Sequence, residues 1–397
     1  MRSPGYLITP SPQGGKLVFY HGSYEWHNTL KVISAAGGPA TEFGWPSLSF
    51  AGTPGYQLWT GDSQSIVVKG ERKGGGWGLW AIPLDGKDPR SLTIDTPLCR
   101  PSPDGSDVRS INWLFSPDAS KLLLIVPQGN GTCDLWVMPI SLSEMRSTGT
   151  AVKVFGGQVP SSWIWWSDLD LWSPDGKRIA FSHKRDIWVA SADGKSVIQL
   201  TKKPPQDPLT LEWDSWPDWS PDGTMITFCT QSAAKTNVLV RVVPASGGEA
   251  RVITDVCPVG YAEPRFYAWS PDGKELTIAS EREGIISHFP FSGGDARTIL
   301  RLKDIGIESA GWLRWSADGR ALGFQGTEGG TPKVYVYQPD NAKLERLDCG
   351  APGDVAPWYW SPDSKWISFF AEQAVKTRPE GILWEMDIEE ALAKLAK

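Results

Sequence analysis

The sequence predicts an all-β protein, a single β-propeller domain over residues 1–397 that is built from four-stranded blades. Two observations predict this fold. A short turn phrase returns every 45 to 57 residues, and a separate strand motif returns between its copies. The chain has 397 residues, 40% of them hydrophobic, with 42 Gly and 32 Pro spread along it, so it is long enough to bury a large core.

The turn phrase is intact in "LWSPDGKRIAF", where Trp172 precedes Ser-Pro-Asp-Gly and a β-patterned run follows. Pro sets φ at the first turn position, Asp accepts hydrogen bonds from the backbone that follows it, and Gly accepts a positive φ. The phrase therefore predicts a tight turn between the first two strands of a blade. The residues that open its eight copies are Pro10, Trp59, Phe115, Trp172, Trp219, Trp269, Trp315 and Trp360.

A second motif predicts the third strand of each blade, as in "DLWVMP" at 134–139 and "DIWVA" at 186–190. Fourth strands complete most blades, but residues from about 388 to 397 predict a short C-terminal helix. Eight modules predict eight blades between about residues 5 and 388. Seven is the alternative, if the degenerate first or second module is an irregular extension. Such sheets must stack face to face, and the anchor tryptophan fills the wedge between two of them.

The charge balance bears on partners and location. A net charge of −6 and a pI near 5.4 argue against nucleic acid and acidic lipid as partners. No run of eighteen apolar residues is present, which predicts no membrane insertion. The N-terminal residues lack the basic and apolar blocks of a secretory signal. Because such a signal can be removed, a periplasmic or secreted location stays open beside a cytoplasmic one.

The phrases at Trp172, Trp219 and Trp269 resemble blades of the TolB-type, WD-repeat-like β-propeller family, and the resemblance covers about residues 5 to 388. It implies the propeller fold, and it favours a periplasmic or secreted location. It implies less about activity. Such repeats occur in periplasmic scaffold proteins, in the propellers of prolyl-oligopeptidase and dipeptidyl-peptidase enzymes, and in some sugar-acid lyases.

Motifs for catalysis are weak in this sequence. The nearest match to a serine-hydrolase elbow, "GDSQS" at 61–65, reads as a degenerate blade turn. The four histidines, at 21, 27, 183 and 288, lack metal-ligand spacing. We expect His21, His27 and His183 to be scattered surface residues on the loop-rich face, with a metal or general-base role as the alternative. The sequence therefore predicts no catalytic residue, no metal and no cofactor, and it favours a protein that is not an enzyme without deciding the question.

The five cysteines fall toward the loop-rich ends of the predicted strands. Cys99 with Cys133, and Cys229 with Cys257, are candidate disulfides that would leave Cys349 free. Reduced, isolated thiols are an equal alternative.

Tryptophan is in surplus, with 22 Trp against 13 Phe and 9 Tyr. Beyond the anchors and the third strands, a set of tryptophans falls just before the first strands, where we expect the mouth of the channel, and charged residues lie among them. Flat rings cover the C–H faces of sugars or peptides, while carboxylates accept hydroxyl or amine protons. The predicted ligand-binding residues are Trp163, Trp165, Trp166, Asp168, Asp214, Trp216, Glu263, Arg265, Trp312 and Trp358. The simpler interpretation is that these rings only fill the wedges between blades.

These observations leave functions of different classes. The first is a monomeric, non-catalytic binding or scaffold protein resembling TolB, which holds a protein, peptide or glycan at the tryptophan-rich face. The second is a carbohydrate-active lyase or glycosidase in the same funnel, for which Asp168 and Asp214 would be the acid pair. The third is a peptidase-type propeller without its hydrolase domain. We expect the binding protein.

Overall fold

The computed structural model describes residues 7–20, 26–27, 29–36, 38–45, 48–51, 58–72, 76–92, 112–128, 132–160, 171–203, 212–232, 237–258, 266–291, 295–347, 355–373 and 380–387. In this part of the chain the regular elements are strands, apart from one 3-10 helix, η5 (Leu302–Ile305). The predicted C-terminal helix lies outside the described residues. The chain forms two compact units, unit 1 (Met1–Gly44 with Val256–Lys397) and unit 2 (Trp45–Asp255). The prediction of a single domain stays a prediction.

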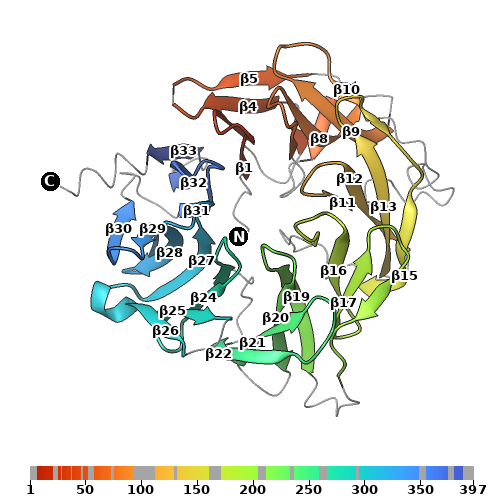
Figure 1. The fold of residues 1–397 in the computed structure, drawn as a ribbon. Coiled ribbons are helices and arrows are strands. Elements are labelled where there is room, and N and C mark those ends of the chain that lie inside the picture. The colour runs from red at the N-terminus through yellow and green to blue at the C-terminus, as the bar shows by residue number, and fades with distance from the viewer. Residues whose placement is uncertain are drawn as a thin grey trace. The chain divides into compact units, whose positions relative to one another are not determined.

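Unit 2 contains four sheets, which we number 2 to 5 in chain order (Figure 1). Sheet 2 consists of β6 (Leu48–Ala51), β7 (Leu58–Trp59), β8 (Ser65–Arg72), β9 (Gly76–Pro83) and β10 (Arg90–Ser91). Sheet 3 consists of β11 (Asn112–Phe115), β12 (Lys121–Pro127), β13 (Thr132–Ser141), β14 (Arg146–Ser147) and β15 (Val152–Pro160). Sheet 4 consists of β16 (Arg178–His183), β17 (Asp186–Ser191) and β18 (Val197–Gln199), preceded by a bridge from Trp172 to Ile179. Sheet 5 consists of β19 (Glu212–Trp219), β20 (Met225–Ser232), β21 (Asn237–Pro244) and β22 (Arg251–Pro258).

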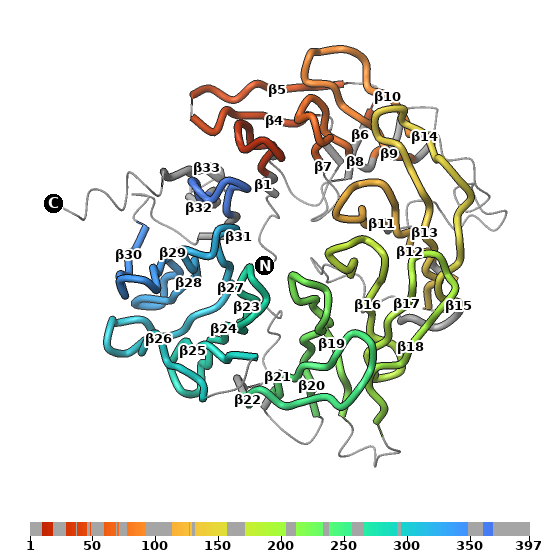
Figure 2. Tube along the Cα trace, viewed as in Figure 1, coloured from red at the N-terminus to blue at the C-terminus, as the bar shows by residue number. Residues whose placement is uncertain are grey.

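Unit 1 contains sheet 1 and sheets 6 to 8, and Figure 2 traces their strands. Sheet 1 consists of β1 (Leu7–Pro10), β2 (Lys16–Tyr20), β4 (Thr29–Ser34) and β5 (Thr41–Gly44). The short β3 (Trp26–His27) lies between β2 and β4 in the chain but is not a strand of sheet 1. Sheet 6 consists of β23 (Tyr267–Trp269), β24 (Glu275–Ser280), β25 (Ile285–Pro290) and β26 (Arg297–Arg301). Sheet 7 consists of β27 (Ser309–Trp315), β28 (Leu322–Glu328), β29 (Thr331–Gln338) and β30 (Lys343–Leu347). Sheet 8 consists of β31 (Val355–Trp360), β32 (Trp366–Gln373) and β33 (Glu380–Asp387).

The all-β prediction is therefore confirmed, and paired strands within the sheets run antiparallel, as β19 and β20 do. The core of each unit lies between sheets. One cluster joins Ile179 and Phe181 of sheet 4 to Leu123 of sheet 3. Another joins Ile187 of sheet 4 to Phe228 of sheet 5. A sheet of three or four short strands cannot bury both faces alone, so its neighbours supply the missing apolar contact.

In sheets 3 to 8 each predicted turn phrase directly follows its anchor and precedes the next strand of the sheet, and its side chains make the bonds that the phrase predicts. In sheet 5, Ser220 Oγ donates to Asp222 Oδ1 over 2.6 Å and accepts from the backbone N–H of Met225 over 2.9 Å. Asp222 Oδ1 also accepts from the backbone N–H of Thr224 over 3.0 Å. The Ser–Asp bond and the bond to Ser Oγ recur at Ser116, Ser173, Ser270, Ser316 and Ser361.

These turn carboxylates make the stability of the protein depend on pH in the acid range. The hydrogen bond from Ser220 lowers the pKa of Asp222. For Asp118, partial burial raises the pKa, but hydrogen bonds from Ser116 and Ser120 outweigh it and lower the pKa to about 2. A carboxylate whose pKa is lower in the folded state stabilises the fold above its unfolded pKa, and that contribution is lost as the pH falls through the folded value.

We therefore expect the free energy of unfolding to fall as the pH drops from about 4 to about 2. Denaturant unfolding followed by circular dichroism at several pH values measures it. In Asp118→Asn the side-chain oxygen still accepts the turn bonds but no longer titrates, so this variant should show a shallower pH dependence. An unchanged slope in the variant would argue against this assignment.

The anchor tryptophans join neighbouring sheets through their indole N–H groups as well as through their rings. Trp172 Nε1 donates to the backbone oxygen of Leu114 in sheet 3 over 3.2 Å. Trp219 Nε1 donates to the backbone oxygen of Leu171, which precedes sheet 4, over 3.1 Å. Each acceptor stands immediately before the anchor of the preceding sheet. The repeated tryptophan therefore fixes the distance between successive sheets in a way that packing alone does not.

Unit 1 brings its first and last sheets together. β1 contacts β31, and a Cβ at Gly14, in the turn of sheet 1, would lie 3.7 Å from the carboxyl carbon of Asp363, in the turn of sheet 8. In unit 2 a Cβ at Gly176, in the turn of sheet 4, would lie 3.5 Å from the Cβ of Ser116, in the turn of sheet 3. Sheet 1 therefore packs on sheet 8 much as sheet 4 packs on sheet 3. Among the described strands, none of sheet 1 pairs with sheet 8.

Candidate functional site

The structure describes four of the ten predicted ligand-binding residues. Asp214 and Trp216 lie in β19 of unit 2, Trp312 lies in β27 of unit 1, and Trp358 lies in β31 of unit 1. The other six, Trp163, Trp165, Trp166, Asp168, Glu263 and Arg265, lie outside the described residues. Convergence of the ten residues on one funnel therefore stays a prediction.

Trp216 and Trp312 occupy the same special position in two different sheets. Each stands three residues before its anchor, at a β-bulge where the register of the first strand shifts against the second. Each has a φ of 55°, in the left-handed region that a bulky residue rarely adopts. Both side chains are half-buried. Glycine is the usual residue at such a bulge position, so a tryptophan there is held against its own backbone preference.

The first strand of sheet 8 contains a bulge at the corresponding place. The register of β31 against β32 shifts between Ala356 and Tyr359, so Pro357 and Trp358 occupy the bulge. Bulges re-aim the side chains around them and are frequent beside functional sites. Trp358 is the second residue of its bulge, and Pro357 stands where Trp216 and Trp312 stand in theirs. The sequence did not reveal these bulges.

Asp214 lies two residues before Trp216 and has no exposed surface. Its Oδ1 accepts a hydrogen bond from Thr230 Oγ1 over 2.6 Å and forms an ion pair with Lys203 Nζ over 2.8 Å. Its Oδ2 has no hydrogen-bond partner within the described part of the chain. Because the side chain of Asp214 is enclosed, its contribution to a binding site is to hold β19 in place around Trp216.

Lys203 connects Asp214 to the buried carboxylate of Asp186. Its ammonium group is also buried and lies 4.0 Å from the carboxylate of Glu212. Its backbone N–H donates to Asp186 Oδ1 over 2.9 Å. Burial raises the pKa of Asp186, and the negative charge of Asp214 adds to this effect, although the bond from Lys203 opposes it. The segment that leaves sheet 4 is thereby tied to the start of β17 and to the start of β19.

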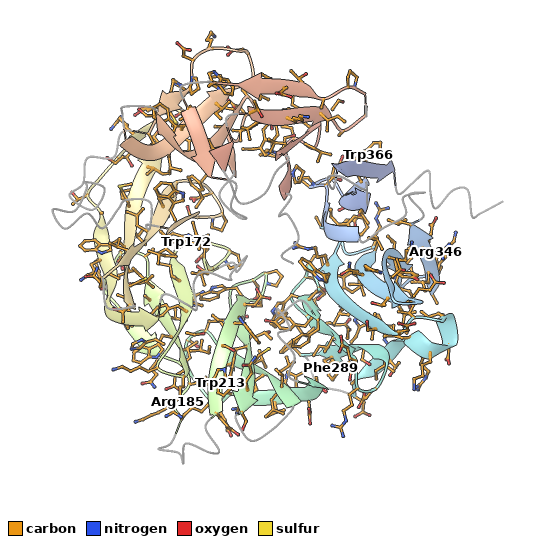
Figure 3. All side chains as sticks on the ribbon, turned by 180° about the vertical axis from the view of Figure 1, so that it is seen from behind. Trp172, Arg185, Trp213, Phe289, Arg346 and Trp366 are labelled. Carbon is orange, nitrogen blue, oxygen red and sulfur yellow. The ribbon has the colours of Figure 1, made fainter. Side chains whose placement is uncertain are left out.

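The hairpin of sheet 4 completes this arrangement. The backbone oxygen of Arg185 accepts from the backbone N–H of Asp214 over 2.9 Å, and Arg185 Nη1 donates to the backbone oxygen of Glu212 over 3.4 Å. Figure 3 shows Arg185 near Trp213 at this end of the two sheets. Charged side chains and backbone bonds together make the start of β19 a rigid support for the bulge.

The expectation of surface histidines is wrong for His183. Its side chain is buried and packs edge-on against Phe155 and Trp188, with ring centroids 5.0 and 5.6 Å apart. His288 is buried as well, and its Nδ1 lies 2.9 Å from Thr277 Oγ1. Burial lowers the pKa of His288 to about 4. His21 lies outside the described residues, and the side chain of His27 is not described. In the described part of the chain, His, Cys, Asp and Glu side chains form no group of three that could hold a metal ion.

The candidate disulfides are not formed, because Cys133 and Cys229 are free and buried thiols. Cys133 pairs with Val159 inside sheet 3, and burial raises its pKa to about 11. Cys229 lies opposite Ser215 in sheet 5, and burial raises its pKa also. Strand ends that share one side of a fold do not bring two Cβ atoms to bonding distance. The reduced alternative therefore holds for these two residues.

A family comparison agrees with the repeated turns. Residues 215–392 match the family model of the TolB beta propeller domain. This part of the chain is similar to TolB β-propeller domains. A Tol-Pal system protein TolB from Anaeromyxobacter dehalogenans is 32% identical over 97 residues, which are 23% of this chain and 19% of that protein. The uncharacterized peptidase YuxL of Bacillus subtilis is 29% identical over 119 residues, 27% of this chain and 16% of that protein. The match thus spans less than a fifth of either relative.

Solved structures show the same kind of fold as the TolB repeats. Dipeptidyl peptidase 4 from Porphyromonas gingivalis has a TM-score of 0.63 at 11% identity and covers 98% of this chain and 59% of its own. An oligogalacturonate lyase from Vibrio parahaemolyticus has a TM-score of 0.50 at 11% identity and covers 98% of this chain and 91% of its own. At this identity the likeness concerns the fold.

No helix in the described residues is long and apolar enough to cross a membrane.

Proposed function

We propose that the chain is an eight-bladed β-propeller of the TolB type that binds a protein, peptide or glycan without catalysing a reaction. The eight sheets of the described residues, each with its turn phrase, support the blade number. The likeness to a dipeptidyl peptidase structure over 98% of the chain supports the propeller. The TolB relatives support a periplasmic or secreted location, with the cytoplasm as the alternative. We expect a monomer.

The observation that carries the proposal is the left-handed backbone of Trp216 and Trp312. A bulky residue in this region costs of order 1–3 kcal/mol and persists where its surroundings hold it. The same position is strained in the same way in sheets 5 and 7, so the strain is not an accident of one loop. A wedge filler would not need it, whereas a ligand platform needs a ring held at a fixed angle. Indole faces then cover the apolar faces of a sugar or of a peptide side chain.

A glycine substitution separates this role from a packing role. We expect Trp216→Gly to leave the free energy of unfolding within about 1 kcal/mol of the parent, because glycine removes the strain as it removes the ring. Ligand affinity should fall at least about tenfold, since a binding ring is lost. The ligand is chosen first with the unmodified protein, from a glycan array and a peptide array.

Trp213→Gly is the matched control. Trp213 is half-buried in the same strand but pairs regularly with Gln231, so glycine relieves no strain there. This variant should be the less stable of the two. If Trp216→Gly loses more stability than Trp213→Gly and keeps full affinity, then Trp216 is a packing residue and the proposed site is wrong.

A further inference from the structure

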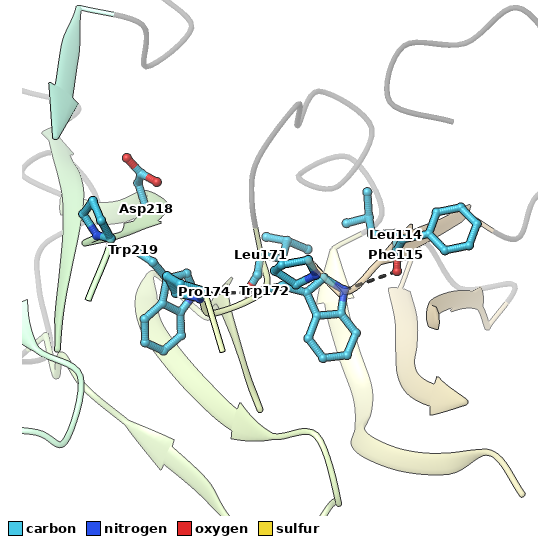
Figure 4. Close-up of a pocket in the computed structure, with 9 residues that line it drawn as sticks. Leu114, Phe115, Leu171, Trp172, Pro174, Asp218 and Trp219 are labelled. Carbon is cyan, nitrogen blue, oxygen red and sulfur yellow. Dashed lines mark hydrogen bonds between the residues drawn. The ribbon is translucent and has the colours of Figure 1, made fainter. Parts of the chain in front are cut away.

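Sheet 4 has one closed edge and one open edge. At the closed edge, Trp172 bridges to Ile179 of β16, and its indole N–H donates to the backbone oxygen of Leu114 in sheet 3 (Figure 4). At the other edge lies β18, which among the described strands pairs with β17 alone. An edge strand presents unpaired backbone groups to which another chain can bond.

The pairing of β17 with β18 shows which backbone groups point toward the open edge. The backbone N–H of Leu200 donates to the oxygen of Ile187 over 2.8 Å, so Leu200 faces β17. In an antiparallel ladder, the backbone groups of alternate residues bond to opposite sides of the strand. The N–H and C=O groups of Val197 and Gln199 therefore point away from β17.

β18 lacks the charged side chains that protect such an edge. Its three residues are Val, Ile and Gln. The last described strand of each other sheet contains at least one charged residue, such as Arg251 in β22, Arg297 in β26 or Lys343 in β30. Charged side chains on an edge strand keep other strands from pairing with it. The edge of sheet 4 is thus the one without this protection.

Apolar side chains are exposed along the same edge. Val197 is 40% exposed and Ile198 is 41% exposed, and consecutive side chains of a strand point to its opposite faces. Val152 of sheet 3 is 39% exposed and lies 2.7 Å from where a Cβ at Gly194 would be, in the turn that leads into β18. They are three of the five large hydrophobic residues exposed in the described part of the chain. A strand beside β18 would cover Val197 and Ile198 with its own side chains.

Hydrogen bonds hold the far end of β18 in place. Gln199 Nε2 donates to Asp186 Oδ2 over 3.0 Å, and the backbone N–H of Lys203 donates to Asp186 Oδ1 over 2.9 Å. The backbone N–H of Ile187 donates to Thr201 Oγ1 over 2.9 Å. A strand that is already held in position loses little conformational freedom when another strand pairs with it.

The exposed charges at this end of sheet 4 are positive. Lys202 follows β18, Lys184 lies in the hairpin between β16 and β17, and both are exposed. Asp186 is buried and Glu212 is half-buried. In a chain with a net charge of −6, this end therefore offers two exposed lysines to an acidic partner.

The length of β18 decides between a second copy of the chain and a peptide. Stable interfaces between folded proteins bury about 1,200–2,000 Å². An edge of three residues with two exposed aliphatic side chains is too short for such an interface. An extended peptide needs less area, because its backbone bonds to the edge supply affinity and its alternate side chains supply specificity.

We propose that β18 binds an extended peptide segment of a partner protein, which adds a strand antiparallel to it. The central residues of the peptide are β-branched and contact Val197 and Ile198. An acidic residue at the N-terminal end of the peptide lies beside Lys202. This site is separate from the one proposed at Trp216 and does not depend on it.

Titration calorimetry on the full chain tests the proposal with matched peptides. The probe is acetyl-Glu-Glu-Val-Thr-Val-Thr amide. A second peptide has the same side chains but is N-methylated at its last four residues. We expect it to bind at least about tenfold more weakly, as the loss of two hydrogen bonds implies. A third peptide, with Lys in place of both Glu, should bind about threefold more weakly or less tightly still.

Variants of the edge locate the peptide. Val197→Pro removes an outward N–H that the pairing with β17 does not use, and it should lower the affinity for the probe at least about tenfold. Val197→Thr keeps this N–H and nearly the same shape, and should stay within about threefold of the parent. Lys202→Gln should weaken binding more than Lys195→Gln, because Lys195 at the other end of β18 is already paired with Asp193.

Amide hydrogen exchange gives a readout that does not depend on the folding of a variant. In the parent protein, the probe should slow exchange within residues 196–200. Protection elsewhere but not there, no binding of the probe, or equal binding of the N-methylated peptide would overturn the proposal. So would self-association of the parent that Val197→Pro abolishes, because the edge would then serve a second copy of the chain.

Discussion

Replacing Trp219 with alanine is expected to lower the free energy of unfolding by about 3–5 kcal/mol, because truncating a buried tryptophan removes its packing and leaves a cavity. Trp219 is 5% exposed and packs in the cluster between sheets 4 and 5. Its indole N–H also bonds to Leu171, so the variant leaves that carbonyl without its donor. Denaturant unfolding followed by circular dichroism measures the loss.

Phenylalanine variants separate the ring from its hydrogen bond. Trp219→Phe keeps an aromatic ring but loses the bond to Leu171. Trp269 is also a buried anchor, stacked on Phe291, but its Nε1 has no hydrogen-bond partner within the described residues. We therefore expect Trp219→Phe to lose about 1 kcal/mol more than Trp269→Phe. Equal losses would mean that the bond between modules contributes nothing to stability.

Replacing Lys203 with methionine is expected to lower the free energy of unfolding by about 3–5 kcal/mol, because it leaves the buried carboxylate of Asp214 without its positively charged partner. Lys203 Nζ lies 2.8 Å from Asp214 Oδ1, and the Asp214 side chain is 0% exposed. The hydrogen bond from Thr230 Oγ1 would then remain at that oxygen. Thermal and denaturant unfolding both report this loss.

Two further variants test whether the loss of stability comes from the buried charge pair. The double variant Lys203→Met with Asp214→Asn removes both charges, and it should be more stable than Lys203→Met alone. Lys195→Met breaks an exposed pair with Asp193 and should change stability little, since exposed pairs contribute little. If Lys203→Met behaves like Lys195→Met, the charge network does not support β19.

The sheets could be predicted because the turn phrase acts locally. Ser, Asp and Gly in one phrase bond to each other and to the backbone within five residues, so neighbouring sheets are not needed to interpret it. The phrase even tolerates loss of its glycine. Ala119 and Ser364 adopt the same left-handed φ, at 54° and 61°. In the module at Trp59, Ser63 adopts this φ as well, at 55°, whereas the module at Pro10 keeps its glycine, Gly14, and lacks the aspartate.

The bulges and the buried network could not be predicted, because they depend on pairing between segments. A bulge at Trp216 is one extra residue against Phe228, and the sequence of β19 alone does not specify it. The sequence placed Asp214 among many acidic residues. The contacts of Asp214 with Lys203 and Thr230 form only because of the way sheets 4 and 5 pack together, which the sequence does not show.

The contact of β1 with β31 means that unit 1 is assembled from both ends of the chain, whereas unit 2 is one continuous stretch. A polypeptide still on the ribosome after Asp255 already carries every sheet of unit 2, but it carries only sheet 1 of unit 1. β1 then stays without the strand that it contacts in the folded unit, β31, until the last third of the protein is translated. Contacts between such distant segments slow folding and leave strand edges open to wrong partners, so the N-terminal sheet is the part of a nascent chain that most needs protection.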